Sequence, residues 1–257
     1  MCNLYSITTP RAEIVDLADV MRDFSHNAPP MPGVYPDYAA PVVLKGADGE
    51  RQMRDLRWGL PSSKTALLDA ATKRADKLRA RGQLVDQARF SELMRLEPDK
   101  GVTNVRNTAS PHWKAWLGPA NRCLVPFSAF SEPDQVGGTL KPVWFALSDE
   151  RPLAFFAGIW TAHACVRKAK TGWEDCEVFG FLTTEANADV GAFHSKAMPV
   201  ILTEPAELAL WMSDAPWAQV EALQRPLPAG SLKVVAAVEP REDPPKAQVS
   251  PGLFDLL

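Results

Sequence analysis

The chain has 257 residues, of which 46% are hydrophobic, and a formal net charge of −3 at pH 7. This length and apolar content suffice for one buried core, so we expect a single domain over residues 1–235 and a proline-rich tail over 236–257. No segment approaches the roughly 18 apolar residues of a membrane helix, and the start lacks a secretory signal, which favours a cytoplasmic protein.

The first predicted elements alternate between strand and helix. We expect a short strand in "LYSIT", a helix in "PRAEIVDLADVMRD", and a loop in the proline-dense "NAPPMPGVYPDYAAP". The stretch "PVVLKGADGERQMRDLRWG" predicts a hairpin that turns at residues 47–49. From Thr65 to about Leu96 the apolar spacing is helical, with one interruption at Gly82. These patterns predict a helical insertion over about residues 62–100.

The second half of the chain is predicted to be rich in strands. Strand patterns occur in "GVTNVR", "NRCLVPFSAFSE", "PVWFALS", "LAFFAGIW" and "CEVFGFLTTEA". Amphipathic helices follow in "PAELALWMSD" and "WAQVEALQR". Many strands bracketed by helices, without regular βαβ alternation, predict an α+β domain with an antiparallel or barrel-like β-sheet core and flanking helices.

The cysteines and histidines form no recognisable metal or disulfide pattern. Cys2, Cys123, Cys165 and Cys176 include no Cys-x-x-Cys pair, and the four histidines lack metal-ligand spacing with them. No phosphate-binding glycine loop is present. We therefore expect no metal, no nucleotide and no other cofactor, and reduced thiols.

Positive charge is concentrated in the middle of the chain. Between Arg51 and Arg122 there are 15 Lys/Arg against 7 Asp/Glu, an excess of 8 positive charges. Such asymmetry is typical of a basic face for a polyanion. A solvated helix is the alternative, because the run "KRADKLRARGQ" from Lys73 alternates charges with alanine and leucine.

The cysteine at position 2 gives the chain a distinctive N-terminus. Removal of Met1, favoured by a small second residue, would leave a thiol and a free α-amine on neighbouring carbons of Cys2. The α-amine has an ordinary pKa of about 7.7–8.0, whereas a lysine amine has one of about 10.4. Near pH 7 a larger fraction of the α-amine is therefore neutral and nucleophilic. A 1,2-aminothiol can attack an acyl carbonyl through sulfur, or condense with an aldehyde through nitrogen and close a thiazolidine.

Three polar residues interrupt apolar strand patterns. Glu132 ends "CLVPFSAFSE", where partial burial would raise the carboxyl pKa and suit it to acid and base catalysis. His194 precedes an apolar strand and could transfer protons near pH 7. Asn104 lies among β-branched residues, where asparagine is disfavoured, which indicates a hydrogen-bonding role or a turn.

Five motifs in order resemble one protein family. Cys2, "RWGL" at Arg57, "TNVR" at Thr103, "RCLVPFSAFSE" at Arg122 and "HSKAMPVIL" at His194 resemble the SOS-response-associated peptidase (SRAP) family. The resemblance implies an SRAP-like fold. It also implies a sensor of abasic sites in single-stranded DNA, associated with the nucleoid when bound, that forms a covalent thiazolidine cross-link and has a peptidase-type activity that exposes the cysteine.

The same resemblance implies roles for individual residues. Cys2 would be the nucleophile, Asn104 would contact the nucleophile and the sugar, Glu132 would be the acid and base, and His194 would be the second proton-transfer group. The implied DNA-binding residues are Arg106 on phosphate, Trp58 stacked near the lesion, and Lys196.

The sequence departs from the family pattern mainly where DNA would be bound. Asn3 and Leu4 replace the usual Gly-Arg, Pro133 replaces a tryptophan, and Lys196 stands where arginine is common. An acidic residue usual after the "N-x-R" motif is also replaced, and the His-to-Met-Pro spacing is one residue longer. The insertion over 62–100 is therefore a hypothetical source of replacement phosphate contacts.

Two other functions remain open at this stage. An N-terminal-nucleophile amidohydrolase or glutamine amidotransferase also uses its α-amine as a base, although no glycine-rich segment follows Cys2. A non-covalent single-stranded DNA module could rely on the eight tryptophans and the basic middle. The tail over 236–257 is expected to pack on the domain or to dock a replication-associated partner.

Overall fold

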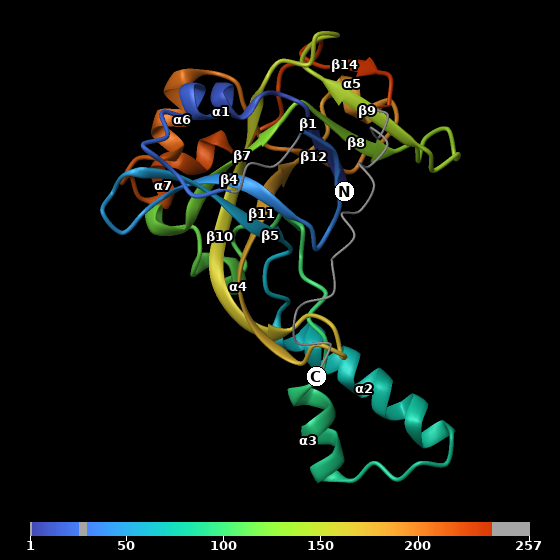
Figure 1. The fold of residues 1–257 in the computed structure, drawn as a ribbon. Helices are drawn as coiled ribbons and strands as arrows, with labels where there is room; N and C mark the ends of the chain where they lie inside the picture. Colours follow the sequence, from blue (N-terminus) through green and yellow to red (C-terminus); the bar gives the residue numbers. More distant parts are fainter. Residues whose placement is uncertain (1, 26–29, 238–257) are drawn as a thin grey trace, which may run out of the picture.

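A closed ring of five strands forms the centre of the molecule (Figure 1). The neighbouring strands along the ring are antiparallel, and the final pair, β11 with β5, is parallel and closes it. The strands of this barrel are β5 (Arg51–Trp58), β4 (Ala39–Lys45), β7 (Arg122–Phe127), β10 (Ala154–Val166) and β11 (Trp173–Thr184). The computed structural model describes residues 2–25 and 30–237.

A second sheet lies against the barrel and contains the N-terminal strand. Its strands, in spatial order, are β14 (Lys233–Val235), β9 (Pro142–Ala146), β8 (Ala129–Pro133), β1 (Leu4–Ile7) and β3 (Met31–Val34). Four short strands extend the barrel sheet, namely β2 (Arg22–Asp23), β6 (Asn104–Val105), β12 (Met198–Pro199) and β13 (Ile201–Leu202). The predicted α+β fold with a barrel-like core is confirmed.

Short helices cover the outside of the two sheets. They are α1 (Arg11–Leu17), α4 (Pro111–Lys114), α5 (Ala188–Gly191), α6 (Pro205–Trp211) and α7 (Trp217–Val220), with 3₁₀ turns at Pro119–Asn121 and Glu221–Leu223. Within the described residues, no helix has the length and apolar content needed to cross a membrane.

The predicted insertion is a helical hairpin that projects from the barrel (Figure 1). We call residues 62–100 the arm; it contains α2 (Lys64–Ala80) and α3 (Gln87–Arg95). Each helix begins at a side-chain cap, because Ser63 Oγ accepts a hydrogen bond from Ala66 N and Asp86 Oδ1 accepts one from Arg89 N. Helix α2 ends shortly before Gly82, whose φ of 76° lies in the left-handed region that favours glycine.

Aromatic side chains fill the barrel core. The rings of Phe127 and Phe156 stack with centroids 3.9 Å apart, and Tyr5 packs edge-on against Trp58 and Phe156. All four side chains are fully buried. Tyr5 comes from β1, so burial of this aromatic group fixes the N-terminal strand of the second sheet against the barrel.

Gly180 allows β6 to lie close to β11. The two strands are parallel, with Asn104 beside Phe181 and Val105 beside Leu182. A Cβ atom on Gly180 would lie only 3.0 Å from the Thr103 carbonyl oxygen and 2.9 Å from a Leu60 methyl group. Glycine at this position therefore permits the close approach that places Asn104 near the N-terminus.

Three predicted segments differ from the structure. The helix expected over residues 10–23 ends at Leu17, and Arg22–Asp23 form strand β2 instead, which pairs with β5. The expected loop over residues 27–41 contains strand β3, which pairs with β1. The single strand predicted in "NRCLVPFSAFSE" is two strands, β7 and β8, because the chain changes sheets at Ser128. Ser128 N donates to Ser6 O, and Ser128 Oγ accepts from Thr8 N, so β1 stabilises this corner. Most of the predicted tail lies outside the described residues.

Candidate active site

The N-terminal cysteine is buried at the beginning of β1. Antiparallel pairing aligns Leu4 with Ser131 on β8, so the residues before Leu4 lie beside Glu132. The Cys2 side chain has no exposed surface, and its Sγ lies 3.5 Å from Leu4 O. The fold thus brings the predicted nucleophile and the predicted carboxylic acid together.

Asn104 holds the backbone of Cys2. Its Nδ2 donates to Cys2 O at 2.7 Å and to Thr103 Oγ1 at 2.7 Å, so both amide hydrogens are used. Thr103 Oγ1 in turn donates to Asn3 Oδ1 at 3.2 Å. Within the described part of the chain, the buried Asn104 Oδ1 has no hydrogen-bond partner. This oxygen is therefore an acceptor left for a hydroxyl or amine of a substrate.

Glu132 and His194 form a buried pair. His194 Nε2 lies 3.6 Å from Glu132 Oε2, and both side chains are almost completely buried. His194 lies just after α5, where its backbone N–H donates a hydrogen bond to Val190 O at 2.8 Å. The structure therefore brings Cys2, Asn104, Glu132 and His194 into one site, although they are far apart in the sequence.

Burial makes this pair suitable for proton transfer near neutral pH. It raises the pKa of the Glu132 carboxyl to about 7, because a charged carboxylate is poorly solvated there. Burial, together with the nearby positive charge of Lys196, lowers the pKa of His194 below its ordinary value. Glu132 can consequently hold or release a proton near pH 7, and His194 is predominantly neutral.

The Cys2 thiol is strongly held in its protonated form. Burial, followed by the negative charge of Glu132, raises the pKa of this thiol far above its ordinary value. A thiolate is the nucleophilic form of cysteine. Attack by sulfur as a first step is therefore disfavoured in the closed site, whereas attack by the terminal amine needs no thiolate.

The residues expected to bind DNA have contrasting positions. Arg106 and Lys196 are exposed, and the Arg106 guanidinium lies 3.6 Å from the exposed carboxylate of Glu185. Trp58, in contrast, is fully buried. Its indole stacks on Phe181 with centroids 5.3 Å apart and donates from Nε1 to Thr103 O at 3.1 Å. Trp58 therefore offers no exposed face for stacking in this structure, and its hydrogen bond positions the segment that carries Asn104.

Thr103 is a site residue that the sequence analysis did not select. Its hydroxyl connects Asn3 to Asn104, and its carbonyl accepts the hydrogen bond from Trp58. The signal was present in the motif "TNVR", in which a hydroxyl side chain directly precedes the asparagine.

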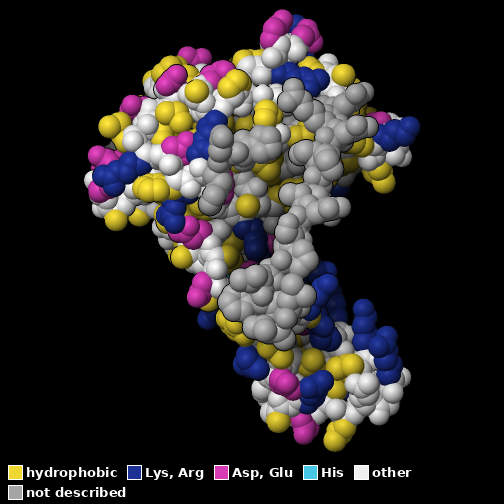
Figure 2. Space-filling view, viewed as in Figure 1, with side chains coloured by type: hydrophobic (Ala, Val, Ile, Leu, Met, Phe, Trp, Pro, Cys, Tyr) yellow, Lys and Arg dark blue, Asp and Glu magenta, His cyan; other side chains and the backbone are white. Residues whose placement is uncertain are grey.

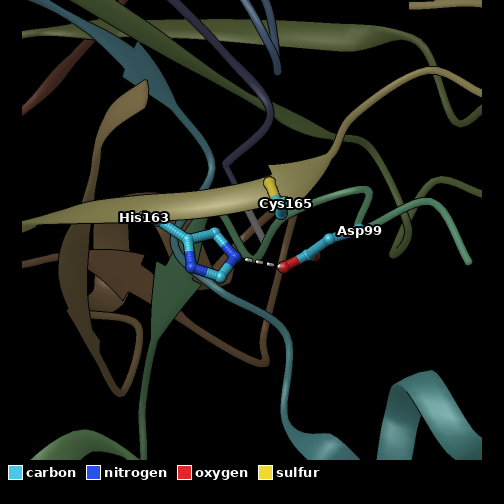
Figure 3. Close-up of side chains that lie close together, drawn as sticks. All are labelled: Asp99, His163 and Cys165. Atoms are coloured by element: carbon cyan, nitrogen blue, oxygen red, sulfur yellow. Dashed lines mark hydrogen bonds and ion pairs between the residues drawn. The ribbon is translucent and has the colours of Figure 1, made fainter. Parts of the chain in front are cut away.

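A separate polar cluster joins the base of the arm to β10 (Figure 3). Asp99, His163 and Cys165 offer ligand atoms within 4.8 Å of one another, an arrangement that could hold a metal ion. Sequence spacing did not indicate it, because the three residues meet only through folding. The Asp99 carboxylate already accepts hydrogen bonds from Ser62 N, Gly101 N and His163 Nε2.

The protonation of this cluster favours a structural role. Burial, which is the largest influence, and the neighbouring Cys176 raise the pKa of the Cys165 thiol to about 12. A metal ion would have to displace that proton. Burial also works to raise the pKa of Asp99, but the hydrogen bond from His163 and those at Ser62 and Gly101 outweigh it and lower that pKa. A charged, hydrogen-bonded Asp99 thus fixes the arm to the barrel.

The fold and this site together define a barrel protein that buries its N-terminal cysteine beside an asparagine, a carboxylic acid and a histidine. The sequence profile of the SOS response associated peptidase (SRAP) family matches residues 1–240. The chain belongs to this family, as its motifs predicted. A search of curated proteins found no match.

Solved structures share the fold at low sequence identity. A protein from Bordetella bronchiseptica is 22% identical with a TM-score of 0.62, and the match covers 93% of this chain and 100% of the other. One from Bacteroides thetaiotaomicron is 18% identical with a TM-score of 0.60, covering 90% of each chain. A phage-related protein from Bordetella bronchiseptica is 17% identical with a TM-score of 0.55, covering 90% and 92%.

Proposed function

We propose that this protein captures abasic sites in single-stranded DNA through the α-amine and thiol of Cys2, after removal of Met1. The observation that carries the proposal is the buried group of four residues. Asn104 Nδ2 holds Cys2 O at 2.7 Å, and the Glu132–His194 pair lies beside the same residue. Family membership supports a role in the response to DNA damage.

The first step is opening of the abasic sugar. An abasic deoxyribose exists mostly as a closed hemiacetal, so a group must remove the hydroxyl proton and return a proton to the ring oxygen. Glu132 suits both tasks, because its pKa of about 7 keeps the protonated and charged forms comparable near neutral pH. The free acceptor Asn104 Oδ1 could bind a sugar hydroxyl during this step.

Nitrogen then attacks the exposed aldehyde. The Cys2 amine adds to the carbonyl carbon, water leaves with a proton supplied by Glu132, and the thiol adds to the imine to close the thiazolidine. The two hydrogens that leave with the aldehyde oxygen come from the amine and the thiol, so the reaction needs no oxidant. The raised pKa of the buried thiol favours this order, since only the last step uses sulfur.

The ring accounts for protection of the lesion. An open imine promotes strand scission by β-elimination, whereas the thiazolidine removes the imine. The peptidase-type activity implied by the family name would correspond to removal of the residue that precedes Cys2, since the α-amine is available only after this cleavage.

The test is denaturing electrophoresis of the purified protein with an oligonucleotide that contains one abasic site. The comparison samples are Cys2→Ala, Cys2→Ser and an undamaged strand, with the intact mass of each product. We expect a covalent band that requires the lesion and Cys2 and whose mass lacks Met1. Both variants keep the α-amine and lose the thiol, so each should give a band only after borohydride reduction of its imine.

Two outcomes would support the other functions. Absence of a band from protein shown to lack Met1, together with hydrolysis of glutamine, would indicate an N-terminal-nucleophile amidohydrolase. Undiminished binding and function in Cys2→Ala would indicate a non-covalent DNA-binding module.

A further inference from the structure

A positively charged groove runs along the arm. It lies between α2 and residues 97–100, and Lys73, Lys77 and Lys100 are among its lining residues. Lys73 and Lys77 are four residues apart on α2, so they project from the same face of the helix. Figure 2 shows Lys and Arg side chains gathered over this helix. We call this feature the α2 groove.

The α2 groove has three lysines available to a ligand. Lys73, Lys77 and Lys100 are exposed, and none of them takes part in an ion pair within residues 2–25 and 30–237. The groove also contains the carboxylate of Glu97, but Arg74 pairs with both of its oxygens, at 2.8 and 3.1 Å. The arrangement leaves net positive charge for an anionic partner.

The lining of the groove favours the phosphate backbone of a nucleic acid over its bases. Its floor includes the small residues Ala66 and Ala70 and no aromatic side chain, so bases have no ring on which to stack. Ammonium groups spaced along one helix face match phosphates that repeat along a strand. The groove is therefore suited to a nucleic acid strand held without regard to its base sequence.

The α2 groove is close to the candidate active site along a rigid segment. Lys100 and Asn104 are only four positions apart in the chain, so their Cα atoms lie at most about 14 Å from each other. The Asp99 carboxylate fixes this segment through Ser62 N at 3.0 Å and Gly101 N at 2.9 Å. A strand bound at Cys2 would thus reach the groove within a few nucleotides.

We infer that the α2 groove binds the phosphates of single-stranded DNA on one side of the abasic site. This inference rests on the proposed function for the position of the lesion at Cys2, whereas binding of the strand itself does not depend on cross-linking. The groove would replace phosphate contacts that are altered at Asn3, Leu4 and Lys196, the positions where this sequence differs from the family pattern.

The first experiment measures non-covalent binding in a Cys2→Ala background. Fluorescence anisotropy with an undamaged single-stranded oligonucleotide is followed over a range of salt concentrations. The groove variant carries Lys73→Glu and Lys77→Glu. The matched control carries Arg81→Glu and Arg95→Glu, which change net charge equally at exposed positions of the arm outside the groove. Arg74 is left intact because it neutralises Glu97.

We expect the groove variant to bind more weakly and with a flatter salt dependence. Each lost phosphate contact reduces the slope of log K against log salt by about 0.7, so two lost contacts reduce it by about 1.4 and weaken binding about 25-fold at 0.1 M salt. The control should keep the wild-type slope. Equal slopes and affinities for the groove variant and the control would overturn the inference.

The second experiment uses the cross-linking reaction. Oligonucleotides with an abasic site carry a progressively shorter flank on the 5′ or the 3′ side. We expect truncation of one flank to slow cross-linking of the intact protein and to have no further effect in the groove variant. If flank length affects the two proteins equally, the inference is wrong. If no oligonucleotide cross-links but the binding difference persists, the proposed function fails and the groove assignment stands.

Discussion

Asn104 Nδ2 donates a 2.7 Å hydrogen bond to the carbonyl oxygen of Cys2, a residue 102 positions earlier in the chain. This bond sets the orientation of the peptide that carries the aminothiol. We expect Asn104→Ala to slow cross-linking about 10- to 100-fold, because a misoriented nucleophile rarely reaches the attacking geometry. Single-turnover kinetics would measure the loss. An unchanged rate in a folded Asn104→Ala protein would contradict the assigned role.

The pH dependence of cross-linking should report Glu132. Burial raises its pKa to about 7, so the acid that assists departure of water is lost as pH rises through that value. We expect the rate to decline above about pH 7, and Glu132→Gln to lose this inflection together with about 100-fold in rate. The measurement is the rate from pH 5 to 9 in both proteins, and persistence of the inflection in Glu132→Gln would assign it to another group.

The same carboxyl should reduce stability at high pH. The unfolded glutamate has a pKa of about 4.5 and the folded one about 7, so the folded state binds more protons between these values. Stability contributed by the protonated form is therefore present below about pH 4.5 and lost as pH rises through 7. We expect Glu132→Gln to raise Tm at pH 8 more than at pH 5, by calorimetry. An equal change in Tm at both pH values would refute this expectation.

The Asp99 carboxylate, in contrast to Glu132, should stabilise the fold at neutral pH and lose this contribution at low pH. Its pKa is lowered by hydrogen bonds from His163, Ser62 and Gly101 that outweigh the effect of burial, so its contribution to stability is present above the unfolded pKa and lost as pH falls through the folded one. We expect Asp99→Asn to cost about 2 kcal/mol near pH 7. Urea unfolding at pH 7 and pH 3 checks this, and the cost should shrink at the lower pH.

Trp58 and Arg106 should separate structural from DNA-binding roles. Trp58→Phe keeps an aromatic ring but removes the hydrogen bond to Thr103 O, so we expect a stability loss of about 1 kcal/mol and unchanged affinity for undamaged single-stranded DNA. Arg106→Ala should weaken that affinity without changing stability. Weaker DNA binding by a folded Trp58→Phe protein would instead indicate that the indole contacts DNA directly.

Much of the fold could be predicted from local patterns. The hairpin of β4 and β5 followed from a turn at Asp48 and Gly49, and the helices of the arm followed from apolar spacing with a break at Gly82. The corner at Ser128 could not be predicted, because "CLVPFSAFSE" is apolar on both sides of it. The change of sheet depends on a hydrogen bond to Ser6, more than a hundred residues away.

The sequence allowed the residues of the candidate site to be proposed, but not the contacts between them. Family motifs identified Cys2, Asn104, Glu132 and His194, and the structure brings them together. The burial of Trp58 was not predictable from its motif, since an exposed and a buried tryptophan look alike in sequence. The meeting of Asp99, His163 and Cys165 likewise depends on packing of the arm against β10.

The hydrogen bond between Ser62 N and the Asp99 carboxylate has a consequence for how this protein can change. It brings the two ends of the arm together at one point of the barrel, so residues 63–98 can be exchanged for a short turn at little cost in loop-closure entropy. The arm is in this sense a removable module. We expect a chain shortened in this way to fold and to keep the arrangement of Cys2, Asn104, Glu132 and His194.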